Sequence, residues 1–171
     1  MVVLEAALDL DTLTDDRNFL LAMNNNLKQR RQYQQIILSR SRNPRHFGKT
    51  NPVHLHLVGE NLYCGDSIEI TVAVDDKNKI QDLKFTGSGC ALCIASADLM
   101  IETVKGRTIE KTLKIIEQFH QVILGHAELT ASTQHLRAIE GAKRYPIKAK
   151  CTTLAWHTLK AAILKGDRHC L

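Results

Sequence analysis

The sequence predicts an α+β fold, in which an antiparallel three-stranded sheet carries helices packed on one face. Residues 53–58, 68–74 and 80–85 show the alternation of apolar and polar side chains that is typical of strands. The stretch "DDKNK" at 75–79 indicates a hairpin turn, and such a short link favours antiparallel neighbours because parallel strands need a long crossover. Helical patterns follow the strands, and this order is typical of α+β domains.

Helices are predicted before and after the strand segments. From Asp16 to about Arg40 the pattern favours a helix, which the asparagines at 24–26 could break. Thr108 is a candidate N-cap for one of the later helices. The helices predicted after the strands cover residues 90–104, 108–124, 133–142 and 150–165, the last of them ended by Gly166.

The composition suits one compact domain. The chain has 171 residues, of which 44% are hydrophobic and 5% aromatic, so the core is expected to be mostly aliphatic. No apolar run approaches the ~20 residues that a membrane-spanning helix needs. The acidic start "MVVLEAALDLDTLTDD" lacks the basic region and cleavage site of a secretory signal. We therefore expect a cytoplasmic protein with no membrane partner.

The charge balance mildly favours acidic partners. Lysine and arginine number 23 against 18 acids, which gives a net charge of +5. The basic residues are spread along the chain, and aromatic residues that could stack on bases are few. We expect no nucleic-acid partner.

Five cysteines are the main chemical signal. In a cytosolic chain of this size they are expected to be reduced thiols or metal ligands rather than disulfides. They are Cys64, Cys90, Cys93, Cys151 and Cys170.

The stretch "YCGDS", residues 63–67, places Cys64 and Asp66 on either side of a glycine, just ahead of a strand. Gly65 can adopt backbone angles that other residues resist. A tight turn there could direct a thiolate and a carboxylate to one point, and both groups bind zinc. The alternative is a polar turn with an incidental cysteine.

The stretch "GSGCALC" places Cys90 at the first turn of a predicted helix, where free N–H groups favour a thiolate. A glycine-rich turn followed by C-x-x-C at a helix start is also typical of a dithiol redox site. The antiparallel layout argues against that alternative. Cys93 lies among small apolar residues and is interpreted as a packing residue.

In "RYPIKAKCTTLAW", Cys151 is predicted to begin the last helix. Lys148 and Lys150 would project to the same side if the preceding segment were extended, and the alternative is a solvated face. Together, Cys64, Asp66, Cys90 and Cys151 would complete a four-ligand zinc site at one end of the sheet. Zn²⁺ with four anionic ligands sums to −2, and Arg144, Lys148 and Lys150 could offset that charge or dock a partner.

The ordered motifs "CGD", "GSGC" and "KCTTLAW" resemble the U-type iron–sulfur cluster assembly proteins, the IscU and NifU N-terminal type. The similarity covers roughly residues 33 to 160 and includes "YQQIILSRSRNPRHFGK" and "VKGRTIEK". Classical scaffolds of the family carry histidine directly before the last cysteine, where this chain has Lys150. That residue and the long segment before Cys151 make the chain most similar to the SufU-like sulfurtransferase branch.

The resemblance implies a function and a site. Cys64, Asp66, Cys90 and Cys151 would bind one zinc, and Cys64 would be the catalytic acceptor of persulfide sulfur from a pyridoxal-phosphate cysteine desulfurase. Asp66 would be the ligand that exchanges most easily, because it is an oxygen donor among thiolates. The sulfur would pass on to downstream iron–sulfur assembly proteins.

Other functions stay open. The same three cysteines and Asp66 could instead assemble a [2Fe–2S] cluster on a scaffold. A zinc-stabilised adaptor that accepts no sulfur is another class, and a Cys90/Cys93 dithiol oxidoreductase a third. The family usually has a small hydroxyl residue where this chain has Cys93, and Cys170 has no assigned partner.

The resemblance also divides the chain. Residues 1–32 are predicted to be an N-terminal extension or helix, residues 33–165 the SufU/IscU-like domain, and residues 166–171 a C-terminal tail.

Overall fold

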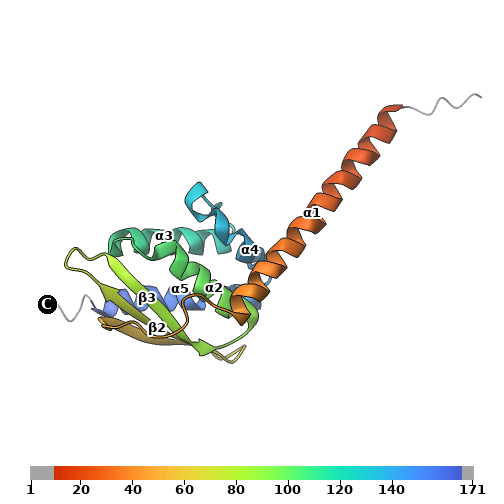
Figure 1. Ribbon diagram of the computed structural model, residues 1–171. Helices are drawn as coiled ribbons and strands as arrows, with labels where there is room; N and C mark the ends of the chain where they lie inside the picture. Colours follow the sequence, from red (N-terminus) through yellow and green to blue (C-terminus); the bar gives the residue numbers. More distant parts are fainter. Residues whose placement is uncertain (1–9, 167–171) are drawn as a thin grey trace, which may run out of the picture.

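The computed structural model describes the backbone of residues 10–166 and the side chains of Leu21 and residues 24–166 (Figure 1). Cys170 and most of the predicted tail lie outside the described residues. The helices are α1 (Leu10–Arg42), α2 (Ala91–Val104), α3 (Ile109–Ile123), α4 (Arg137–Glu140) and α5 (Pro146–Gly166), with short 3₁₀ turns η1 (Ala131–Leu136) and η2 (Gly141–Arg144). The strands are β1 (Leu55–Asn61), β2 (Asp66–Val74) and β3 (Ile80–Ser88).

The sheet is an antiparallel meander in the order β1-β2-β3, which confirms the predicted fold class. The Asp75–Lys79 link is a tight turn, because the Asp75 carboxylate accepts backbone N–H groups of Lys77 and Lys79 at 2.9 Å each. Asn61 pairs with Asp66 at the last position of the β1–β2 ladder. Only residues 62–65 connect those two strands, so the loop that carries Cys64 is fixed at both ends.

The core lies between the sheet and the helices that cover one face of it (Figure 1). Ile68, Ile70 and Val72 of β2 are fully buried there. The Ser96 hydroxyl links α2 to α5: it donates to the Thr152 carbonyl at 2.6 Å and accepts from the Trp156 indole N–H at 3.1 Å. These contacts set α5 against the start of α2, and so place Cys151 near Cys90.

The predicted first helix is confirmed as α1, which is continuous over 33 residues, so the asparagines at 24–26 do not break it. It projects away from the body of the molecule, and only its C-terminal part touches other elements (Figure 1). Residues 24–32 are exposed. The helix crosses the predicted division between residues 32 and 33, which itself stays a prediction.

Helix α5 begins at Pro146 rather than near residue 150. Proline suits the first position of a helix, since its missing N–H would have no partner there. Lys148 and Lys150 therefore lie in a helix and not in the extended segment on which they would share a side. Two residues span about 200° of a helix, so the two side chains diverge. Cys151 lies in the second turn of α5, not at its start. The predicted helix over 133–142 is a chain of short turns, η1, α4 and η2.

Candidate metal centre

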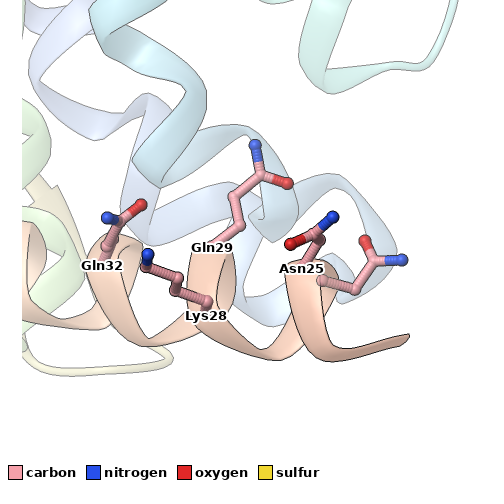
Figure 2. Close-up of a pocket in the computed structure, with 5 residues that line it drawn as sticks. Asn25, Lys28, Gln29 and Gln32 are labelled. Carbon is pink, nitrogen blue, oxygen red and sulfur yellow. The ribbon is translucent and has the colours of Figure 1, made fainter. Parts of the chain in front are cut away.

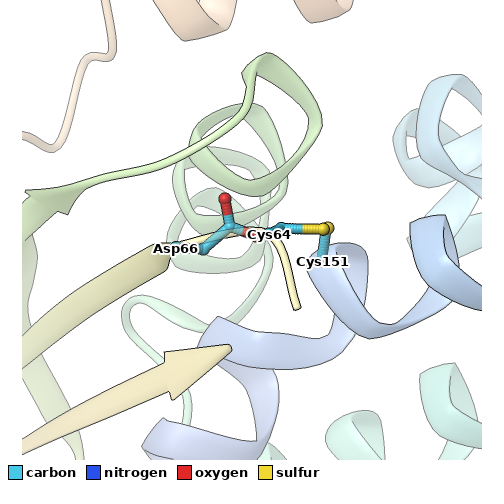
Figure 3. A group of neighbouring side chains, drawn as sticks. All are labelled: Cys64, Asp66 and Cys151. Carbon is cyan, nitrogen blue, oxygen red and sulfur yellow. The ribbon is translucent and has the colours of Figure 1, made fainter. Parts of the chain in front are cut away.

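Cys64, Asp66 and Cys151 form one cluster where the β1–β2 loop meets α5 (Figure 3). One ligand atom from each lies within 4.8 Å of the others. The Cys151 thiol donates to the Cys64 sulfur at 3.0 Å. Cys64 is half-buried, whereas Asp66 and Cys151 are buried. Three of the four predicted ligands are thus brought together from residues that lie up to 87 positions apart.

Asp66 is held by neutral donors. It is only 2% exposed. Its Oδ1 accepts the backbone N–H of Cys90 at 2.8 Å, and its Oδ2 accepts from the Asn61 amide at 3.4 Å. A side chain at position 89 would place Cβ 2.8 Å from Asp66 Oδ1, so Gly89 permits this close approach. Glycine at position 89 therefore allows the Asp66 carboxylate to reach the N–H of Cys90.

Cys90 touches the cluster through its backbone. It is the N-cap of α2, half-buried, and its N–H binds Asp66. Its sulfur is not in the group of donor atoms within 4.8 Å of one another, although its thiol is near enough to help raise the pKa of Cys151. Its role as the fourth ligand stays a prediction.

The pKa of the Cys151 thiol is raised above its usual value, first by burial and then by Cys64, Asp66 and Cys90. A protonated thiol binds metal poorly, because the thiolate is the ligand. Metal binding here must therefore release protons and weaken as the pH falls.

The residues present fit a metal ion. Among the residues that the structure describes, Asp66 takes part in no ion pair. Buried charges in proteins are paired or coordinate metals, and thiolates with a carboxylate are ligands that zinc and iron–sulfur chemistry accept. A cation placed among Cys64, Asp66 and Cys151 would supply the missing charge partner.

The structure defines a contact for one of the predicted basic neighbours. Lys150 places its Nζ 4.0 Å from the centre of the Tyr63 ring, in a cation–π contact. Lys148 and Arg144 are exposed, and their predicted role beside the metal or in docking stays untested. Sequence reasoning missed Asn61, which links Asp66 to Cys151 through contacts of 3.4 and 3.5 Å, and it missed Tyr63.

Cys93 is a core residue, with its side chain 0% exposed. Burial, and then the charges of Asp66, Cys90 and Cys64, raise the pKa of its thiol. A neutral, inaccessible thiol is a poor partner for exchange with Cys90. This environment supports the packing interpretation and argues against the dithiol oxidoreductase.

An open hollow of about 570 Å³ lies along α1 and is lined by Asn25, Asn26, Lys28, Gln29 and Gln32 (Figure 2). Its amide and ammonium groups include no thiol, carboxylate or imidazole, so it offers no competing metal site. In the part of the chain that the structure describes, no helix is both long and apolar enough to cross a membrane.

The three-stranded sheet and the cysteine–aspartate cluster define a class of protein, and the chain belongs to it: the family of NifU-like N-terminal domains, whose sequence model matches residues 32–169. The resemblance to U-type iron–sulfur cluster assembly proteins is thereby confirmed.

Two curated relatives and one solved structure illustrate the family. The zinc-dependent sulfurtransferase SufU of Bacillus subtilis is 31% identical over 136 residues, covering 79% of this chain and 91% of that protein. The iron–sulfur cluster assembly scaffold protein IscU of Thermotoga maritima is 32% identical over 136 residues, covering 80% and 95%. FiSufU of Fervidobacterium islandicum AW-1, a candidate assembly scaffold of the SUF system, superposes with a TM-score of 0.68 at 32% identity, covering 75% and 93%. The chain is thus a member of the SufU/IscU group of iron–sulfur cluster assembly proteins.

Proposed function

We propose that this chain is a zinc-dependent sulfur acceptor, which takes persulfide sulfur onto Cys64 from a pyridoxal-phosphate cysteine desulfurase. The observation that carries the proposal is the unequal exposure of the cluster: Cys64 is half-exposed on a four-residue loop, while Asp66 and Cys151 are buried behind it. A partner can reach Cys64 but not Asp66 or Cys151. Cys90 is also half-buried, but it is the N-cap of α2 and lies outside the group of close donor atoms, so Cys64 is the exposed donor of that group. Cys64 is the catalytic residue of this proposal, and the pyridoxal phosphate belongs to the partner.

Cys64, Asp66, Cys90 and Cys151 would hold the zinc. When bound, zinc would keep the thiols ionised at neutral pH, which burial otherwise opposes at Cys151. Lys150 supports zinc binding by these four residues alone, because it faces the Tyr63 ring and an ammonium group is no metal ligand. The donors near the cluster are then three thiols and one carboxylate.

The chemical step is a thiol–persulfide exchange. The Cys64 thiolate attacks the outer sulfur of the partner's persulfide. A sulfur–sulfur bond forms at Cys64, the bond within the partner's persulfide breaks, and the electron pair leaves with the partner's thiolate. The outer sulfur keeps its proton or charge, so no oxidant or reductant is consumed.

The surface around Cys64 suits a protein partner. Leu62, Tyr63, Tyr145 and Ile147 are exposed hydrophobic residues on the two segments that flank the cluster. Exposed apolar residues gathered beside a site are typical of protein–protein contacts. Lys148 and Arg144 are exposed close by in sequence and would favour acidic groups on the desulfurase.

The second candidate function is a scaffold that assembles a [2Fe–2S] cluster on Cys64, Asp66, Cys90 and Cys151. Its support is the Thermotoga maritima scaffold, which is as similar to this chain as the Bacillus subtilis sulfurtransferase. Thiolates serve iron–sulfur clusters as well as zinc.

The deciding experiment is anaerobic mass spectrometry. Zinc-loaded protein is mixed with a cysteine desulfurase and L-cysteine, and added sulfur is mapped by peptide. We expect one sulfur on Cys64 with zinc retained. No sulfur on Cys64, but a cluster once iron is supplied, would establish the scaffold instead.

Two variants control this measurement. Cys64→Ala should accept no sulfur, and unchanged acceptance would refute the proposal. Cys93→Ser is the matched cysteine control and should accept sulfur as the wild type does, because Cys93 lies in the core.

A further inference from the structure

The loop that carries Cys64 has few contacts outside itself. Residues 62–65 lie between Asn61 and Asp66, both buried and paired across the ladder. Leu62 and Tyr63 are 87% and 79% exposed. The N–H groups of Tyr63 and Cys64 bind back to the side chain and the carbonyl of Asn61, at 3.3 and 3.2 Å. These bonds shape the turn but do not fix it to α5.

Among the described residues, one hydrogen bond and one cation–π contact join the side chains of this loop to α5. One is the Cys64–Cys151 thiol contact at 3.0 Å, which belongs to the site and must change whenever Cys64 reacts. The other is the Lys150 ammonium over the Tyr63 ring at 4.0 Å. The Tyr63–Lys150 contact is therefore the one that can hold the loop independently of the chemistry of Cys64.

The surroundings leave the loop room to move. On one side of Cys64 the chain passes through Gly65 at φ +67°, where a Cβ would meet nothing within 4 Å. On the other side an open groove of about 400 Å³ separates Leu62 and Tyr63 from Leu154 and His157 of α5. Cys64 itself packs against the core, but Gly65 on one flank and the groove on the other leave space into which the loop can move.

We propose that Tyr63 and Lys150 are positioning residues that latch the Cys64 loop onto α5 and set how often Cys64 swings away from Cys151. The relevance of the latch to sulfur transfer rests on the proposed function, but the latch itself is a property of the free chain. An exposed cation–π contact of this kind changes an opening equilibrium by about two- to five-fold.

The test is the rate at which iodoacetamide alkylates Cys64 in the metal-free full chain, followed by peptide mass spectrometry. Tyr63→Leu removes the ring without changing charge, and we expect alkylation to be about two- to five-fold faster. Tyr63→Phe and Lys150→Arg keep a ring and a cation, and should react at the wild-type rate. Wild-type rates in Tyr63→Leu would overturn the latch.

Lys150→Met removes the other partner of the contact. It also removes a positive charge near Cys64, and such a loss by itself changes thiol reactivity, so this variant needs its own controls. Lys148→Met removes the same charge two positions away, on a different side of α5, and reports the effect of charge alone. The double variant Tyr63→Leu/Lys150→Met should differ from Tyr63→Leu by no more than Lys148→Met differs from the wild type. If Lys150→Met has an equal effect with and without the Tyr63 ring, the two residues are not coupled and the proposal fails.

Sulfur mapping separates this proposal from the proposed function. If alkylation shows the latch but Cys64 accepts no persulfide sulfur, the latch proposal stands and the proposed sulfurtransferase function is wrong. If Cys64 accepts sulfur but Tyr63 and Lys150 show no coupling, the proposed function stands and the latch proposal is wrong.

Discussion

Two buried aspartates, Asp66 and Asp98, have opposite electrostatic surroundings. Asp98 is 0% exposed, and its carboxylate is fully paired within the chain. Arg40 of α1 donates to its Oδ2 at 2.7 Å, while the His46 backbone N–H and ring Nδ1 lie 2.9 Å from its Oδ1. Asp66 is nearly as buried, yet it receives only the N–H of Cys90 and the amide of Asn61.

The difference distinguishes a structural carboxylate from one that is available to a ligand. Asp98 joins the end of α1 and the following loop to α2, and Arg40 extends the pairing to Glu102. A buried charge with its own cation has no need of a metal. Asp66 lacks that cation and stands beside two thiols, so the fold tolerates it most easily when a metal ion is bound.

The largest effect is expected at Asp98. Asp98→Ala removes the buried partner of the Arg40 guanidinium and the acceptor of the His46 N–H, while Glu102 still pairs with Arg40. We expect the free energy of unfolding to fall by about 3 kcal/mol. Urea unfolding of the metal-free protein measures it. Zinc affinity, measured at a temperature where the variant is folded, should be unchanged; a loss below 1 kcal/mol would mean that the pair is dispensable.

Asp66→Asn should do the reverse. It keeps the shape and removes a buried, unpaired charge, so the metal-free protein should be as stable as the wild type or more so. Zinc affinity should fall by about 100-fold. Mutating a residue that only hydrogen-bonds to a metal ligand already lowers affinity by about 10- to 100-fold, and Asp66 is proposed to be a ligand itself. Competition with a chromogenic chelator measures the affinity. Unchanged affinity would remove Asp66 from the site.

A neutral buried group sharpens the comparison. Ser96 lies on α2, the helix that carries Asp98. Ser96→Ala removes no charge but leaves the buried Trp156 N–H without its acceptor. The expected loss is about 1–3 kcal/mol in thermal or urea unfolding. Thr158 is buried and its hydroxyl donates to the Leu154 carbonyl of its own helix at 2.8 Å, so Thr158→Val is a control that should cost less than Ser96→Ala.

The smallest effect concerns Cys93, which is buried and uncharged. Burial raises its pKa above the usual 9.0, so the folded state keeps the proton more tightly than the unfolded state does. The resulting stability is fully present below pH 9.0 and is lost as the pH rises above it. Above pH 9.0 the free energy of unfolding of metal-free Cys93→Ala should fall less steeply with pH than that of the metal-free wild type, by up to about 1.4 kcal/mol per pH unit. Equal slopes in the two proteins would contradict this assignment.

Much of this arrangement could be predicted from the sequence, because the evidence is local. The alternation of apolar and polar side chains predicted the three strands, and the short motifs around Cys64, Cys90 and Cys151 indicated the candidate metal ligands. Pairing across the ladder lengthened each strand beyond its alternating part, since neighbouring strands supply hydrogen bonds that no local pattern records.

Other features depend on distant contacts and could not be predicted in this way. Arg40 and Asp98 lie 58 positions apart, and no sequence pattern near either residue indicates that the two are paired. Pro146 suits both a rigid extended segment and the first residue of a helix, and packing against η2 and the sheet decides for the helix. That choice in turn directs Lys150 to Tyr63 rather than alongside Lys148.

Helix α1 has a consequence for how the protein behaves in solution. Its 33 residues extend about 50 Å, whereas a compact chain of 171 residues has a radius of gyration of about 15–16 Å. Drag depends on length more than on mass, so a single 19.2 kDa chain should elute from a sizing column ahead of globular standards of its own mass. A monomer could therefore be mistaken for a dimer, and light scattering, which weighs the particle, is the measurement that counts its subunits.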